Sequence, residues 1–396
     1  MDFRTTERQQ ELIDSAARIA VRNLMPLAQD HSPQGVQRLR EAMAQAGLLG
    51  LNMPESHGGV GLPLLDTLMI VQTLQSHASI MGGLAHRSST GAVGAISELG
   101  TDAQRDAFVS GVCAGRFGIG IGITEPEAGS AATSMTTRAR IEGDSVVLNG
   151  RKQFVSFVDN NSYTLTYCRF GSTGKASDIG AVIVPHDAPG FSRSKGSLNM
   201  ADELLFELYF DECRVPRENV LLDGSAFGKL ISVYNAERLG SLARMLGSAE
   251  AAFALAVDYA KTRRQFGREI GEFQGIQWML ADMKVKLEAA KLMVYRAASN
   301  AGHGLPNPAE TSMAKVFTAQ AAKEVCDAAI QIFGANGYMK EFPLAQRYAE
   351  VRGGSIYGGT IQIHKNMIAG AVLGRSNNQW RREPEPKTRA PQNTAD

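Results

Sequence analysis

The sequence predicts an α+β multidomain protein in which a β domain separates two helical domains. Apolar residues recur with a helical period from about residue 6 to 118 and again from about 227 to 373. The segment between them consists of short, β-rich runs bounded by turn residues, and 396 residues exceed one typical hydrophobic core. We therefore expect an N-terminal helical domain at 1–118, a central β-barrel-like domain at 119–226 and a C-terminal four-helix bundle at 227–375. Residues 376–396 are rich in Pro and charge, which predicts a disordered tail.

The N-terminal domain is predicted to be helical because its apolar segments are separated by Gly or Pro. Four segments have this pattern: 11–24, 35–51, 64–86 and 89–100. The stretch from Leu84 to Ile96 is rich in Ala, Gly and Ser, which predicts one tightly packed helix. His86 and Arg87 interrupt its pattern, so their side chains are candidates for a pocket.

The β domain is predicted to begin where the period changes, at GIGIGITEPEAGS (118–130). Alternating Gly and Ile indicate a strand with one face bare of side chains, which suits close approach by another backbone or a flat ligand. The spacing G-x-G-x-x-G is absent, so this run is not a dinucleotide-binding fingerprint. Turn residues at Gly143-Asp144 and Asn149-Gly150 predict hairpins, and the second pair is the stronger signal.

The C-terminal bundle is organised around the stretch from Val233 to Gln274, whose Leu and Ala residues form a helical stripe. The opposite face carries small residues that let a backbone or a flat ligand approach: Gly240, Ser241, Gly247, Ser248 and Ala251. Glu237 lies near the start of this stretch. An acid near the first turn of a helix commonly favours the helix dipole or is a solvated charge, so a catalytic role for Glu237 depends on its context.

Composition favours a small ligand over a nucleic acid or a membrane surface, because 41 basic residues balance 40 acidic ones. Four distant cysteines, Cys113, Cys168, Cys213 and Cys326, form no C-x-x-C pair, which argues against a metal site or disulfides. The sequence contains neither a signal-peptide pattern nor an apolar window of about 18 residues. We expect a cytoplasmic protein.

Four motifs in a fixed order give the sequence a resemblance to a known family. They are Ile123-Thr124-Glu125-Pro126 with Gly129-Ser130, then Arg263 to Gln274, then Gln331 to Gly337, and finally Gly358-Gly359-Thr360-Ile361-Gln362. From Met1 to about Gly374 the chain resembles the acyl-CoA dehydrogenase family. The resemblance implies that family's fold, bound FAD, an acyl-CoA or acyl-carrier thioester as substrate, and an electron-transferring flavoprotein as partner. It also implies a homo-oligomer, either a dimer or a dimer of dimers, because the cofactor is shared between subunits.

The resemblance assigns the cofactor residues position by position. Thr124 would hydrogen-bond the isoalloxazine edge, and Ser130 would lie between flavin and substrate. Arg263, Gln265 and Phe266 match positions that reach the FAD of a neighbouring subunit. The full set is Ile121, Ile123, Thr124, Ser130, Phe154, Ser156, Arg263, Gln265, Phe266, Gln274, Gln331, Gly334, Ala335, Thr360 and Gln362.

The resemblance also points to the catalytic base. The family reaction removes an α proton while the β hydride passes to flavin N5, and a carboxylate base is required. Many members carry that base where this chain has Gly358, but a branch that includes isovaleryl-CoA dehydrogenases carries it at the position of Glu237. Glu237 is therefore the predicted base. Arg238, Gly358 and Gly359, with Ser130, are the predicted substrate-binding residues, and the Gly358 N–H would polarise the thioester carbonyl.

Three alternatives stay open. Ala131 and its neighbours look similar to 3-sulfinopropanoyl-CoA desulfinases, which cleave a C–S bond, although that branch has Gln at the position of Glu237 and Arg at that of Gly83. A thioester on a carrier protein could replace CoA. The chain could also be a non-catalytic subunit of a hetero-oligomer.

Overall fold

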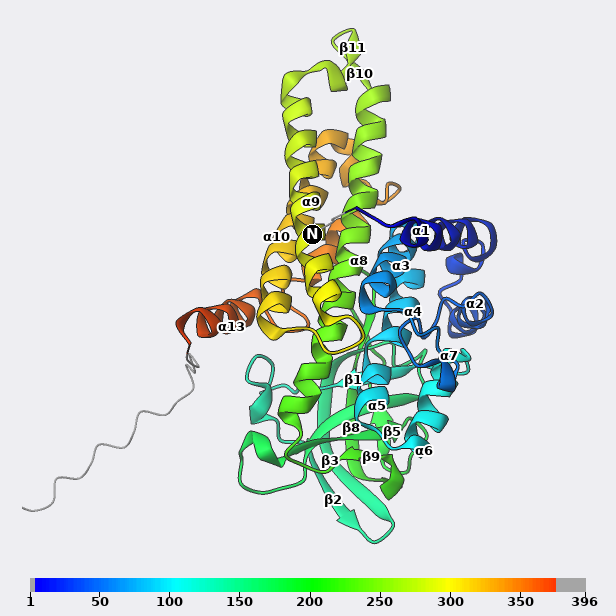
Figure 1. Cartoon of the computed structure of the whole chain (residues 1–396), viewed down its shortest axis with the longest axis vertical. Coiled ribbons are helices and arrows are strands. Elements are labelled where there is room, and N and C mark those ends of the chain that lie inside the picture. The colour runs from blue at the N-terminus through cyan, green and yellow to red at the C-terminus, as the bar shows by residue number, and fades with distance from the viewer. Residues whose placement is uncertain (1–3, 375–396) are drawn as a thin grey trace, which may run out of the picture.

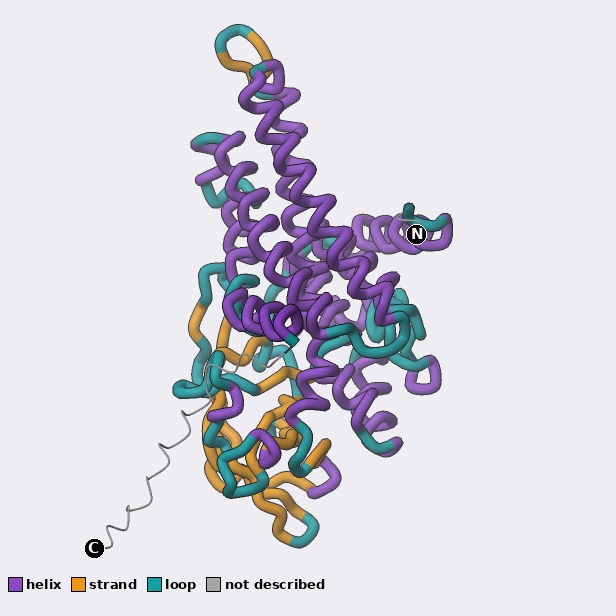
Figure 2. Tube along the Cα trace, turned by 60° about the vertical axis from the view of Figure 1, so that its left-hand side comes forward, coloured by secondary structure: helices purple, strands orange, loops and turns teal. Residues whose placement is uncertain are grey.

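The computed structural model describes residues 4–374 of the chain. The predicted α+β architecture is confirmed: helices of the first third, a central β-sheet and a long helical bundle follow one another in chain order. The bundle forms the long axis of the molecule, the sheet lies at one end of it, and the N-terminal helices flank both (Figures 1 and 2). The tail predicted at 376–396 lies outside the described residues.

The first two α-helices, α1 and α2, begin at side chains that accept hydrogen bonds from the first turn. Thr6 caps α1 and Ser32 caps α2, each at the N-terminal end of its helix. The helical elements are α1 (Glu7–Ile19), η1 (Ala20–Leu24), η2 (Leu27–Gln29), α2 (Pro33–Gln45), η3 (Glu55–His57), α3 (Leu64–His77), α4 (Ser79–Ser89), α5 (Ala92–Leu99), α6 (Asp102–Gln104), η4 (Arg105–Val109) and α7 (Ser110–Cys113). The prediction of a single helix from Leu84 to Ile96 is wrong, because the helix is interrupted at Thr90 and Gly91, between α4 and α5.

The β domain forms one nine-stranded sheet in the order β6-β8-β3-β2-β4-β5-β9, with β1 also paired to β4 and β7 to β8. Its elements are β1 (Ile119–Gly122), η5 (Ala132–Ser134), β2 (Arg138–Glu142), β3 (Ser145–Ser156), β4 (Tyr163–Arg169), η6 (Ala176–Asp178), β5 (Ile179–Pro185), β6 (Phe191–Arg193), β7 (Ser197–Leu198), β8 (Leu204–Pro216), η7 (Arg217–Asn219) and β9 (Val220–Leu222). The prediction of a hairpin at Asn149-Gly150 is wrong. β3 continues through this pair, where a bulge against β8 uses the φ of +140° at Gly150.

The C-terminal region consists of three long helices and shorter ones that pack against them. Its elements are α8 (Phe227–Thr262), β10 (Arg264–Gln265), β11 (Arg268–Glu269), η8 (Ile270–Glu272), α9 (Gln274–Ala301), α10 (Pro308–Phe333), α11 (Ala335–Tyr338), α12 (Leu344–Gly353) and α13 (Ile361–Leu373). The β10–β11 hairpin lies at the end of the bundle farthest from the sheet (Figure 1). The sequence suggested that Glu237 lies near the first turn of its helix. Because α8 begins at Phe227, Glu237 instead lies in the helix interior.

One hydrophobic core joins the N-terminal helices to the bundle, with α8 in contact with α3, α4, α9 and α10. The small residues of α8 make this contact possible. A Cβ on Gly240 would overlap the His86 ring, and one on Gly247 would overlap the backbone of Gln72. Of the two partners that the sequence left open for this face, a backbone or a flat ligand, both glycines therefore meet protein, and they allow close helix packing.

The four cysteines are free and buried. Within residues 4–374, no group of three or more His, Cys, Asp or Glu side chains is arranged to hold a metal ion. Among the described helices, none is long and apolar enough to cross a membrane.

Candidate active site

The carboxylate of Glu237 lies where α8 crosses α4. The imidazole Nε2 of His86 lies 2.9 Å from Glu237 Oε2, and the Thr90 hydroxyl donates to the same oxygen at 2.9 Å. The side chain of Glu237 is 14% exposed, whereas that of His86 is 2% exposed. Glu237 thus has one oxygen held by two donors and keeps limited access to solvent.

Two opposing effects act on the pKa of Glu237. Burial raises this pKa, but the charge of His86 and the hydrogen bonds from His86 and Thr90 lower it more, so the net shift is downward. The effect of removal from water is therefore outweighed here by two polar neighbours. Glu237 is an ionised carboxylate at neutral pH, as a base must be.

The glycine face of β1 is covered by protein. A Cβ on Gly120 would lie 3.5 Å from Thr164, and one on Gly122 would lie 3.2 Å from Thr164 and 3.4 Å from Lys152. The bare face therefore permits close strand packing, not ligand approach. The other face points toward Glu237, because Ile121 Cδ1 and Glu237 Oε2 both lie within 4 Å of the position that a Cβ on Gly91 would take.

A buried ion pair fixes the end of β1. Lys152 Nζ lies 2.7 Å from Glu125 Oε1 and donates to the Ile123 carbonyl at 3.1 Å. The other Glu125 oxygen accepts from the backbone and hydroxyl of Thr136. Burial raises the pKa of Glu125, but Lys152 and the hydrogen bonds lower this pKa by more, so that the net value is about 2. This network holds Ile123 and the adjoining Thr124, both predicted flavin residues.

Three polar side chains hold the loop that contains Gly358. The Gly358 carbonyl accepts from Arg238 Nε at 2.9 Å and contacts His364 Nε2 at 3.2 Å. Lys315 Nζ donates to the Tyr357 carbonyl at 3.0 Å. Burial, with the charge of Arg238, lowers the pKa of Lys315 to about 7. The two carbonyls are thus fixed, and the Gly358 N–H has no acceptor in the described part of the chain.

Two phenols, Tyr234 and Tyr357, lie close enough to Glu237 to be affected by its charge. Burial is the largest cause of the raised pKa values of Tyr234 and Tyr357, although Tyr357 is 43% exposed. Glu237 contributes to both shifts, so both phenols lie within its electrostatic range. Glu237, the two phenols and the Gly358 loop therefore lie near one another.

The predicted cofactor residues fall into two groups within one chain. The group near the sheet and the sheet-side end of the bundle comprises Ile121, Ile123, Thr124, Ser130, Phe154, Ser156, Thr360 and Gln362, with the predicted substrate residues Arg238, Gly358 and Gly359. The group at the far end of the bundle comprises Arg263, Gln265, Phe266, Gln274, Gln331, Gly334 and Ala335 (Figure 1). A single chain therefore separates the two groups by the length of the bundle.

Two phenylalanines support a flat ligand at these positions. Phe154 has a φ of 57° and is 65% exposed, and Phe266 has a φ of 52° and is 93% exposed. A left-handed backbone in a bulky residue is strained, and such strain gathers at functional sites. Each ring is thus held outward for stacking, so the residues present fit an isoalloxazine or adenine ring.

Several residues of this site could not be assigned from the sequence. His86 was a candidate pocket residue, but nothing in its spacing links it to Glu237. Thr90, Lys152 and Lys315 carried no signal, although a lysine within an apolar strand or helix is itself unusual. Arg238 was predicted to contact substrate. In the structure it donates to Asn235 and to the Gly358 carbonyl.

Family models match nearly all of the chain. They are described as the acyl-CoA dehydrogenase N-terminal domain at residues 6–116, the middle domain at 120–213 and the C-terminal domain at 227–373. These three matches occur in chain order and include Glu237.

Individual relatives extend over the same length. The chain is 38% identical over 387 residues to a 3-sulfinopropanoyl-CoA desulfinase from Paraburkholderia xenovorans, covering 96% of this chain and 99% of the relative. A chain from a structure of the electron transferring flavoprotein of Acidaminococcus fermentans is 33% identical, with a TM-score of 0.89 over 94% of this chain and 100% of that chain. Butyryl-CoA dehydrogenase from Megasphaera elsdenii is 30% identical, with a TM-score of 0.87 over 94% and 100%.

Proposed function

The chain belongs to the acyl-CoA dehydrogenase family, and we propose that it desaturates an acyl thioester between its α and β carbons with Glu237 as the base. It is an FAD-dependent oxidoreductase that acts on acyl-CoA. The observation that carries the proposal is the ionised, partly exposed carboxylate of Glu237 beside the Gly358 loop, which has no side chain to act as a base.

FAD supplies the acceptor for the β hydride when it is bound. The residues that would hold it are those of the two groups described above, with Thr124, Phe154 and Ser156 on the flavin side and Arg263 at the far end. An arginine suits a pyrophosphate because its planar donors match two oxygens.

Glu237 would take the α proton directly. Its Oε2 is held by His86 and Thr90, which leaves Oε1 without a described donor and available for the proton. A held carboxylate loses little orientational freedom when substrate binds, and this favours proton transfer. The side chain of His86 also lowers the pKa of Glu237, which keeps the base ionised before substrate arrives.

The peptide between Tyr357 and Gly358 would polarise the thioester carbonyl. Its N–H is free of described acceptors, and its carbonyl accepts from Lys315 Nζ. A hydrogen bond to the carbonyl of a peptide strengthens the N–H of that peptide as a donor. The negative charge that develops on the thioester oxygen would be stabilised by this N–H.

An oligomer would complete the cofactor site. One chain keeps the two groups of cofactor residues apart, so a second copy must supply the far group. An exposed apolar stripe on α9, Trp278, Val285 and Leu292, offers a surface for that copy. We expect a dimer or a dimer of dimers, which sedimentation of the FAD-loaded protein would test; a monomer that retains FAD would contradict this.

We expect an electron-transferring flavoprotein to accept the electrons of the reduced FAD. Similarity to a chain from the Acidaminococcus fermentans structure supports an electron transferring flavoprotein as the acceptor. Reduction of that flavoprotein by the substrate-reduced enzyme tests this partner. A cytoplasmic location stays a prediction, for fractionation to test.

A desulfinase activity is the second candidate, because the Paraburkholderia xenovorans relative is 38% identical over nearly the whole chain. The carboxylate at position 237 favours dehydrogenation, since that branch was expected to carry Gln there. Carrier-protein thioesters are a further substrate possibility that the described residues do not distinguish from CoA.

The decisive experiment mixes FAD-loaded enzyme anaerobically with short, branched, aromatic and dicarboxylic acyl-CoAs and with 3-sulfinopropanoyl-CoA. Flavin bleaching and an enoyl product support dehydrogenation. Sulfite release without bleaching would instead favour desulfination. A colourless homomer that takes up no FAD would contradict both activities and favour a non-catalytic subunit.

A further inference from the structure

We propose that Thr90 passes the proton that Glu237 removes from the thioester to water in a cavity beside Thr90, so that Glu237 loses this proton while the ligand is still bound. The inference rests on the proposed function, because it takes Glu237 as the base.

A proton exit is needed because desaturation leaves one proton on Glu237 in every turnover. The side chain of Glu237 is 14% exposed. A thioester whose α carbon lies at Glu237 would cover this exposed part, so solvent would no longer reach the carboxylate from that side. The proton must then leave through the side chains that hold the carboxylate, which are those of His86 and Thr90.

The ring of His86 offers no onward path. Its Nε2 atom lies 2.9 Å from Glu237 Oε2, but its Nδ1 atom is buried and has no hydrogen-bond partner in the described part of the chain. A proton that passes through an imidazole enters at one nitrogen and leaves from the other. His86 therefore holds Glu237 without connecting it to solvent.

The hydroxyl of Thr90 has the contacts that a proton relay needs. Thr90 follows the last residue of α4, and its Oγ1 lies 2.9 Å from Glu237 Oε2 and 3.1 Å from the His86 carbonyl. A hydroxyl has one hydrogen and two lone pairs, so it can accept one proton while it gives up another. Thr90 is buried, so the base meets this hydroxyl within the protein.

Thr90 also lines a cavity of about 220 Å³, and Glu237 is not among the described lining residues. The lining residues with polar side chains are Asn52, Ser89, Thr90, Ser97, Glu98 and His303. Ser89 and Thr90 are buried, whereas Glu98 and His303 are exposed, so the cavity runs from the interior beside Thr90 to the surface. Its volume suits several water molecules at roughly 30 Å³ each.

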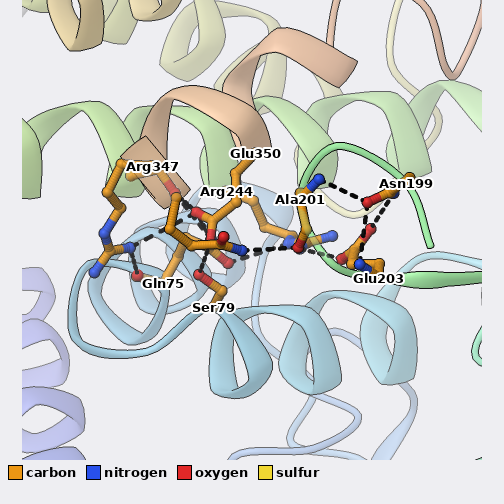
Figure 3. Close-up of polar contacts among 10 residues, drawn as sticks. Gln75, Ser79, Asn199, Ala201, Glu203, Arg244, Arg347 and Glu350 are labelled. Atoms are coloured by element: carbon orange, nitrogen blue, oxygen red, sulfur yellow. Dashed lines mark hydrogen bonds and ion pairs between the residues drawn. The ribbon is translucent and has the colours of Figure 1, made fainter. Parts of the chain in front are cut away.

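An unsatisfied polar atom indicates water in this cavity. Buried polar groups elsewhere have protein partners: Glu350 accepts from Gln75 Nε2 at 3.4 Å and from the Ser79 hydroxyl (Figure 3). Asn52 differs, because its Oδ1 atom is buried and has no hydrogen-bond partner among residues 4–374, although Asn52 lines the cavity. A water molecule there would donate to Asn52 Oδ1 and satisfy it.

The proposed step conserves protons. Once Oε1 of Glu237 carries the α proton, a half-turn of the carboxyl group presents that O–H to Thr90 Oγ1, because this torsion has two equivalent minima. Thr90 Oγ1 accepts the proton as its own hydrogen passes to a cavity water, and the water releases one proton to solvent. Glu237 is then a carboxylate again and Thr90 a hydroxyl, so no further reactant is needed.

Exchange of the α hydrogen with solvent tests the relay. The ligand is a 3-thiaacyl-CoA, in which sulfur replaces the β carbon, so the α proton can be removed but no β hydride can leave. The FAD-loaded enzyme and this ligand are placed in deuterium oxide, and mass spectrometry follows deuterium at the α carbon. In each protein the exchange rate is divided by the rate of flavin reduction by an acyl-CoA of the same length. This ratio, measured where Glu237 is ionised, corrects for changes in the base itself.

We expect Thr90→Val to lower this ratio at least about tenfold, because proton transfer through the hydroxyl is lost. Thr90→Ser, which keeps the hydroxyl, should retain the wild-type ratio. Gly94→Leu should also lower the ratio, because Gly94 lines the cavity and a Cβ there would meet only Val233 Cγ1, at 4.0 Å, so the added side chain displaces water. Gly228→Leu is the matched control: an added Cβ at this exposed position on α8 meets nothing within 4 Å, and the ratio should stay unchanged.

An unchanged ratio in either Thr90→Val or Gly94→Leu would overturn the inference. If Thr90→Val does not fold, the comparison of Gly94→Leu with Gly228→Leu decides. If no acyl-CoA reduces the wild-type flavin, the proposed function fails. If the wild-type flavin is reduced but the α hydrogen of the 3-thiaacyl-CoA does not exchange, the relay alone is refuted.

Discussion

The imidazole Nε2 of His86 lies 2.9 Å from Glu237 Oε2, although 151 residues separate the two in the chain. His86 comes from the N-terminal helices and Glu237 from the bundle, so their contact depends on the packing of α4 against α8. The Nδ1 atom of His86 is buried and has no hydrogen-bond partner among residues 4–374. The hydrogen-bonding capacity of the ring is therefore directed at Glu237.

His86→Leu should shift the acid limb of the pH–rate profile to higher pH. His86 lowers the pKa of Glu237, and burial, which raises that pKa, would remain in the variant. Protonation would then remove the base at a higher pH than in the wild type. The measurement is the rate of anaerobic flavin reduction as a function of pH. Thr90→Val, which removes one hydrogen bond, should produce a smaller shift in the same direction; an unchanged profile in His86→Leu would refute this role.

Gly240→Ala should destabilise the protein and disturb the base, because the new methyl group would overlap the His86 ring. Overpacking of this kind typically costs about 1–3 kcal/mol. Gly228→Ala is the matched control: it lies on the same helix, α8, and its added methyl group meets nothing within 4 Å. Urea unfolding of both variants provides the comparison, and equal stability in the two would contradict the packing described here.

Lys315→Met should weaken thioester binding and slow flavin reduction by roughly tenfold, because the hydrogen bond from Lys315 Nζ to the Tyr357 carbonyl is lost. Lys315 contacts the Tyr357 carbonyl and not the ligand, so the effect should pass through the Gly358 N–H. Thioether ligands, which have no carbonyl, should bind Lys315→Met as tightly as the wild type. Equal losses for thioesters and thioethers would instead indicate a general structural defect.

Glu125→Gln should lower the free energy of unfolding by about 3–5 kcal/mol, because it leaves the ammonium of Lys152 buried without a counter-ion. The wild type should lose the same stabilisation in acid. The pKa of Glu125 is about 2 in the folded chain against 4.5 ordinarily, so its contribution is complete above about pH 4.5 and falls toward pH 2. Acid unfolding of the two proteins measures this. Glu127→Gln, at an exposed position in the same motif, should behave as the wild type.

The sequence was sufficient to predict the order of the domains, because the change from helical to strand periodicity is local information. It also singled out Glu237, since Gly358 lacks a carboxylate and the motif order identified the family. The contacts of Glu237 with His86 and Thr90 could not be predicted, because they depend on how two distant helices cross. The small size of Gly240 is what permits that crossing, and a pattern of small residues alone did not distinguish helix packing from a ligand wall.

Strand pairing explains two errors in the β domain. Asn149-Gly150 has the composition of a tight turn, but β3 continues through it because β8 pairs with both sides of the bulge. The glycine face of β1 likewise reads as open in the sequence and is covered by Thr164 and Lys152 in the structure. In both cases the deciding partner lies on a strand that is not adjacent in the chain.

Anaerobic titration of Glu237→Gln with an acyl-CoA that bleaches the wild-type flavin tests the assignment of the base most directly. Gln has nearly the same size but cannot take the proton, and Glu237 is not among the predicted FAD contacts. We expect the variant to retain FAD and bind the thioester, while bleaching falls by several orders of magnitude. Bleaching at the wild-type rate would show that Glu237 is not the base.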